Sequence, residues 1–173
     1  SGIRAARDSL LPWYFGQGNI AAHRANMAYA ALLSGITLAQ VGLGSVHGLA
    51  APLGAFFPIP HGVVCGTLVA ECSAVNIRCL QTREPQNPAL RKYAELGRVL
   101  SNKPDLANEA AHRHLRELLR DWTAQLDLPR IGHYGMTRAD IPRVVANCRG
   151  SSMKTNPVVL ADDEIVEILE ARL

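Results

Sequence analysis

The chain has 173 residues and a net charge of +3, and 48% of its residues are hydrophobic while only 5% are aromatic. This length suffices for one domain with a substantial core. Basic residues are scattered without a run, which argues against a nucleic-acid groove. The apolar stretches at 27–39 and 62–70 fall short of the ~20 residues that span a bilayer, and no secretory signal is recognisable. We therefore expect a cytoplasmic protein with a core of small aliphatic side chains.

The first part of the chain predicts two helices. Apolar residues recur at close to helical spacing over residues 3–15. Gly16 and Gly18 then interrupt the pattern, and Asn19 is placed to cap a helix over residues 20–40. The second half of this helix is apolar nearly all round, which predicts a central and buried helix.

The middle of the chain predicts two helices joined by a rigid bend. A glycine-rich joint at residues 41–46 leads into a short helix over 47–57. Residues 57–60 read Phe-Pro-Ile-Pro and should be extended, because each proline disfavours the helical conformation in its predecessor. A second helix is expected from residue 61 through residue 79.

The last part of the chain is also helical in pattern. We expect a helix over 88–101, and a long amphipathic helix that starts at Pro104 and runs to Leu126. His112 and His114 lie beside its outer charged row and are interpreted as surface residues. Further expected elements are a loop at 129–136, a helix from Thr137 to Cys148, a loop at 150–157, and a final helix to Arg172 capped by Asp162 or Asp163. No run of alternating β-branched residues appears, so the predicted fold is all-α: one domain over residues 1–173, a bundle of roughly seven to nine helices.

Three of the four cysteines recur every seven residues, at Cys65, Cys72 and Cys79. This spacing places them on one helix face. Thiols two helical turns apart cannot pair with each other, and no CxxC motif is present. They are therefore interpreted as small buried core residues, and free thiols are typical of a reducing cytoplasm.

The candidate metal ligands are His47 and His61. The stretch between them carries prolines at 52, 58 and 60 and a glycine at 54, so the connector is stiff and sharply bent. Imidazole is the commonest protein ligand for transition metals, and two imidazoles on such a connector predict half of a metal site. The other histidines lack such a context and are interpreted as ordinary structural residues: His23, His112, His114 and His133.

The motif around these histidines resembles the iron-type (group III) alcohol dehydrogenases. It reads G-x-G-x-x-H at Gly42, Gly44 and His47, followed fourteen residues after that histidine by P-H-G at residues 60–62. The turn at Asn156-Pro157 before a last short helix agrees with it. The resemblance covers essentially the whole chain and implies the helical C-terminal domain of that family.

Several expectations come with this resemblance. In the family, an N-terminal α/β domain binds the nicotinamide dinucleotide, and the helical domain holds a divalent metal, iron or zinc, through a D-x-x-x-H pair and two histidines that match His47 and His61. Residues 1–46 contain no D-x-x-x-H, and no G-x-G-x-x-G phosphate loop is present. The resemblance thus implies part of an NAD(P)-dependent enzyme that interconverts alcohols with aldehydes or ketones. Its other domain and its upstream ligands would precede Ser1. We expect the chain alone to be inactive and to bind neither metal nor NAD(P) tightly, and the enzyme to be a homo-oligomer without nucleic-acid or membrane partners.

The sequence also departs from the family pattern. Many members carry a further pocket histidine four residues after the first, where this chain has Ala51. Two imidazoles alone hold a divalent metal weakly, because catalytic sites normally have three protein ligands. The alternatives are a non-enzymatic helical interaction module with a decayed metal site, and a related enzyme of the same superfamily, such as a maleylacetate reductase, a glycerol dehydrogenase or a dehydroquinate synthase. A third is a site completed within this chain by His133 or an aspartate.

Overall fold

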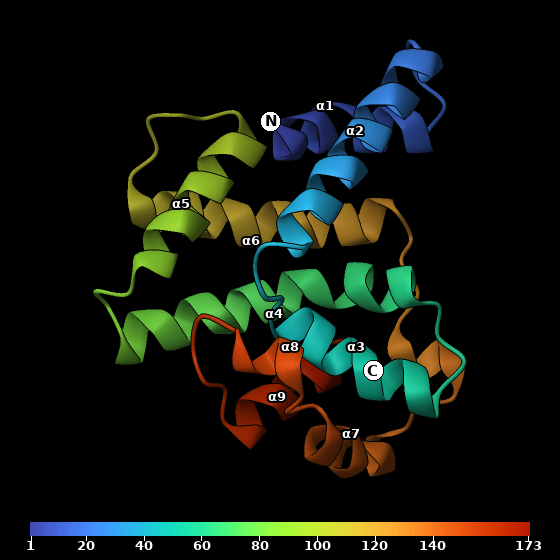
Figure 1. Cartoon of the computed structure of the whole chain (residues 1–173), viewed down its shortest axis with the longest axis vertical. Coiled ribbons are helices and arrows are strands. Elements are labelled where there is room, and N and C mark those ends of the chain that lie inside the picture. Colours follow the sequence, from blue (N-terminus) through green and yellow to red (C-terminus); the bar gives the residue numbers. More distant parts are fainter. The chain divides into compact units, whose positions relative to one another are not determined.

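A computed structural model describes residues 1–173 and contains nine α-helices, two 3-10 helices and no strand (Figure 1). The predicted all-α fold and helix number are confirmed. In chain order the elements are α1 Gly2–Tyr14, α2 Ile20–Leu38, α3 Ser45–Phe56, α4 His61–Arg83, α5 Pro88–Ser101, α6 Asn108–Gln125, η1 Ile131–Tyr134, η2 Arg138–Asp140, α7 Ile141–Asn147, α8 Ser151–Lys154 and α9 Asp162–Ala171. They form two compact units, residues 1–41 with 93–126 and residues 42–92 with 127–173. The single domain over residues 1–173 stays a prediction.

In the first unit, α1 and α2 pack side by side (Figure 1). Their connection depends on Gly16 and Gly18, whose φ angles of +66° and +64° are strained for any residue with a Cβ. The side chain of Asn19 accepts a hydrogen bond from the N–H of Ala22 at 3.1 Å. The predicted break and helix cap are therefore both confirmed.

The prediction that α2 is central and buried is wrong. None of its residues is buried, and Leu32 and Ile36 are 62% and 54% exposed. A helix that is apolar all round needs partners on every side, whereas α1 covers only one side of α2. A large apolar surface is left uncovered along α2.

The helix expected to start at Pro104 begins instead at Asn108. Asn102, at φ +55°, ends α5, and the guanidinium of Arg98 donates to the carbonyl of Leu106 and to the Asn108 side chain, both at 2.7 Å. These bonds hold the segment before α6 in a non-helical turn. His112 is buried at 4% exposure rather than lying on the surface, because the register of α6 turns it inward.

The second unit is built around α4. Eleven α4 residues are buried, α3 and α9 pack against it, and α7 and α8 pack against α3 (Figure 1). By length and composition alone α4 could cross a membrane, but most of its apolar stretch is buried within the protein. It is a core helix, and the extended Phe57–Pro60 bend before it has the predicted conformation.

The remaining differences concern short elements near the end of the chain. The two predicted loops contain η1 and the single turn α8, and the helix expected from Thr137 is divided into η2 and α7. The capping residue of α9 is Ala161, whose N–H donates to the Glu164 carboxylate at 2.7 Å, and Asp162 is already the first helical residue. A shift of one residue is no larger than the uncertainty with which a helix boundary is located.

Candidate metal site

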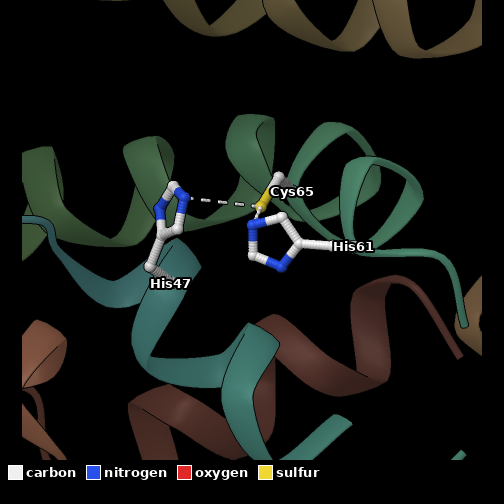
Figure 2. A group of neighbouring side chains, drawn as sticks. All are labelled: His47, His61 and Cys65. Carbon is white, nitrogen blue, oxygen red and sulfur yellow. Dashed lines mark hydrogen bonds between the residues drawn. The ribbon is translucent and has the colours of Figure 1, made fainter. Parts of the chain in front are cut away.

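The histidine pair lies where α3 and α4 pack together (Figure 2). His47 is in the first turn of α3, and His61 is the first residue of α4. The extended segment from Phe57 to Pro60 reverses the chain between them, so the two rings lie with their centroids 5.3 Å apart. The structure thus brings together the two residues that the motif singled out.

A third donor that sequence reasoning missed lies between them. The sulfur of Cys65 is 3.5 Å from Nε2 of His61 and 3.7 Å from Nε2 of His47 (Figure 2). Cys72 and Cys79 are buried as predicted, but Cys65 is only half-buried, so its assignment to the core is wrong. The available signal was the i, i+4 spacing from His61 to Cys65, which places both side chains on one helix face.

The three side chains fit a divalent cation. Their ligand atoms all lie within 4.8 Å of one another, and no carboxylate belongs to the group. Burial, and next the nearby His61, lower the pKa of His47, which favours the neutral imidazole that binds metals. The cluster therefore has the donor types and the spacing of a transition-metal site.

The remaining histidines and Ala51 take no part in this cluster. His133 is exposed with its ring against Tyr134, and His23 hydrogen-bonds the hydroxyl of Ser9 through Nδ1 at 3.1 Å. Ala51 is an exposed α3 residue one turn after His47. Neither His133 nor an aspartate completes the site; the residue beside the pair is Cys65.

The glycines of the motif and the Asn-Pro turn belong to one arrangement that positions α3. A Cβ on Gly42 would lie 2.4 Å from the Thr155 side chain, and one on Gly44 would lie 3.1 Å from Oδ1 of Asn156. That same oxygen accepts hydrogen bonds from the N–H of Ser45 at 2.9 Å and from the Asn76 amide at 3.1 Å. The start of α3, two residues before His47, is thereby held by a side chain more than a hundred residues away.

Comparison with known proteins assigns the family. The sequence profile of the C-terminal part of the Fe-containing alcohol dehydrogenase family matches residues 8–173. The chain is 30% identical to the 1-propanol dehydrogenase PduQ of Citrobacter freundii over 171 residues, which is 94% of this chain and 44% of that protein. It is also 30% identical to the lactaldehyde reductase of Escherichia coli K12 over 149 residues, 82% of this chain and 36% of that protein. The chain belongs to the iron-containing alcohol dehydrogenase family, and it spans less than half the length of these relatives.

Solved structures show the same fold. A 1,3-propanediol oxidoreductase superposes with a TM-score of 0.82 at 23% identity, and an alcohol dehydrogenase from Oenococcus oeni with a TM-score of 0.83 at 23% identity. In both cases 99% of this chain is aligned with 43% of the other. The helical architecture described above is therefore that of the C-terminal part of such enzymes.

Proposed function

We propose that this chain is the metal-holding C-terminal part of an NAD(P)-dependent alcohol dehydrogenase that interconverts alcohols with aldehydes or ketones. The observation that carries the proposal is the facing pair His47 and His61, with ring centroids 5.3 Å apart, in the motif by which the sequence resembles the family. A divalent cation held there, Fe²⁺ or Zn²⁺, would supply Lewis acidity to an alcohol or carbonyl oxygen. The names of the relatives favour short aliphatic alcohols and aldehydes as substrates.

The residues of this chain would hold and orient that ion. Both histidines come from helices that pack against each other, so their rings are held on rigid elements. His61 is exposed, which leaves the site open on one side for a small substrate. An upstream α/β domain would bring the NAD(P) and a D-x-x-x-H ligand pair, and a cytoplasmic homo-oligomer is part of the same proposal.

The proposal predicts a specific loss in the full-length enzyme. His47→Ala should lower kcat/KM for alcohol-dependent NAD(P)⁺ reduction by at least about 100-fold. Replacing a residue that merely holds a metal ligand already lowers activity by about 10–100-fold, and removing the ligand itself should cost more. Metal content should fall in parallel, measured by elemental analysis of the purified enzyme.

His133→Ala is the matched control, since this exposed histidine lies outside the cluster. It should leave both activity and metal content unchanged. Full activity in His47→Ala, or an upstream sequence without D-x-x-x-H, would contradict the proposed function.

One observation favours the non-enzymatic alternative, an interaction module. The uncovered apolar surface along α2 and just beyond its end includes Leu32, Ile36 and Val41, which are 62%, 54% and 58% exposed. Contiguous exposed apolar surface of this kind commonly marks a protein interface. Metal-dependent alcohol oxidation by the full-length protein would rule out a module without catalysis.

The same surface predicts self-association of the isolated chain. Ile36→Lys places a charge in the middle of this face and should shift the chain toward the monomer, measured by sedimentation velocity over a range of concentrations. Thr82→Lys adds the same charge on α4 at an exposed position and should leave the distribution unchanged. Equal behaviour of both variants would show that α2 is not the contact surface.

A further inference from the structure

The sulfur of Cys65 lies at distances from the two imidazole nitrogens that fit a tetrahedral metal ion. With bond lengths of about 2.3 Å to sulfur and about 2.05 Å to nitrogen, tetrahedral angles separate the two donor atoms by about 3.6 Å. The observed separations are 3.5 Å to His61 and 3.7 Å to His47. Both distances match at once, although the residues come from two different helices.

We propose that Cys65 is a third protein ligand. His47, His61 and Cys65 together then form a site at which this chain binds a zinc-class metal ion by itself. The inference rests on the proposed ligand role of the two histidines. It differs from the proposed function in two ways. Cys65 is added to the ligands, and the site no longer needs a further domain to bind metal, whereas two imidazoles alone were expected to bind it weakly.

The local architecture supports a three-ligand site with one free position. His61 and Cys65 are one turn apart on α4, so they offer a nitrogen and a sulfur from one face, while His47 approaches from α3 (Figure 2). An exposed His61 and a half-buried Cys65 give an ion access from solvent. In this chain alone, three protein ligands leave the fourth tetrahedral position for water, as in zinc sites with an open position.

The sulfur also decides which metal is preferred. Two imidazoles suit iron and zinc alike, whereas a thiolate favours softer ions such as Zn²⁺ and its spectroscopic substitute Co²⁺. The Cys65 thiol loses its proton to solvent as the cation binds. We therefore expect Zn²⁺ to be held in preference to Fe²⁺, despite the family name.

The chain contains a matched control on the same helix. Cys72 lies two turns beyond Cys65 on α4, is buried, and does not belong to the cluster. Burial raises the pKa of its thiol to about 12. Replacing Cys72 removes a thiol from the same helix without touching the proposed site.

The test is a titration of the metal-free 173-residue chain with Co²⁺, followed by absorption spectroscopy. We expect one equivalent to bind with visible bands of tetrahedral cobalt and a near-ultraviolet thiolate-to-cobalt charge-transfer band, both abolished by Zn²⁺. Cys65→Ser should lose the charge-transfer band and weaken cobalt binding by at least about 100-fold, more than is lost when a residue that only supports a ligand is replaced. Cys72→Ser should retain the band and the affinity.

The outcomes separate this inference from the proposed function. Cobalt binding that depends on His47 and His61 but lacks the charge-transfer band, or survives Cys65→Ser, overturns the role of Cys65 and leaves the histidines as ligands. Absence of binding to this chain overturns the self-sufficient site, while the full-length assay still tests the histidines. Cobalt binding that is unaffected by His47→Ala contradicts both the three-ligand site and the proposed function.

A second measurement does not depend on any variant. Cys65 is the only one of the four cysteines that is not buried. Alkylation of the native chain with iodoacetamide, mapped by mass spectrometry, should therefore modify Cys65 first. Stoichiometric Zn²⁺ should protect it, and Mg²⁺ should not; equal labelling with and without Zn²⁺ counts against the thiolate ligand.

Discussion

Gly97→Ala should lower the free energy of unfolding by about 3 kcal/mol, at the upper end of what overpacking a core costs. A Cβ at this position of α5 would lie 2.2 Å from the carbonyl oxygen of Ala111 in α6. The obstacle is backbone, so no side-chain rotation relieves the contact, and the two helices must separate. Urea unfolding followed by circular dichroism measures the loss.

Gly35→Ala is the matched control for this substitution. Gly35 is also a helical glycine of the first unit, but a Cβ there meets nothing within 4 Å. Replacing an exposed helical glycine by alanine should stabilise the chain by about 0.5–1 kcal/mol. The two variants should change the free energy of unfolding in opposite directions. Equal unfolding midpoints would mean that α5 and α6 pack less closely at Gly97 than described.

The helices were predictable because their patterns depend on local chemistry. Proline and glycine interrupt helices by backbone geometry, so the break at Gly16 and the bend at Phe57–Pro60 could be located from the residues alone. Burial was harder to predict, because it depends on partners. The apolar α2 was expected to be buried, yet the pattern of a helix does not say how many neighbours cover it.

The site was predicted in part for the same reason. His47 and His61 are carried by a motif with fixed spacing, and the structure does bring them together. Cys65 was missed because its seven-residue spacing from Cys72 suggested one buried stripe. A helix drifts by about 20° per seven residues relative to such a repeat, and Cys65 lies one turn after the start of α4, beside His47 of α3.

Replacing Asn156 is the second change with a large expected effect. Its Oδ1 accepts from the N–H of Ser45 and from Asn76, while its Nδ2 donates to Asn76 and to the carbonyl of Val158, both at 2.8 Å. Asn156→Ala removes all four bonds and should lower the free energy of unfolding by about 2–3 kcal/mol, because buried polar groups lose their partners. Asn147→Ala is the control, since that exposed amide binds only its own helix, at Arg143, and should change stability by less than about 0.5 kcal/mol.

Asn156→Asp separates the role of this side chain in positioning α3 from its role in stability. A carboxylate keeps the acceptor for the Ser45 N–H but cannot donate to Asn76 or Val158. We expect Asn156→Asp to be destabilised as well, yet to keep the geometry at the start of α3. Its cobalt affinity, measured where both variants remain folded, should then stay close to that of the parent chain, whereas Asn156→Ala should bind more weakly because the first turn that carries His47 is released. Equal affinities in the two variants would mean that packing against α4 alone positions His47, and that the Asn156 side chain acts on stability only.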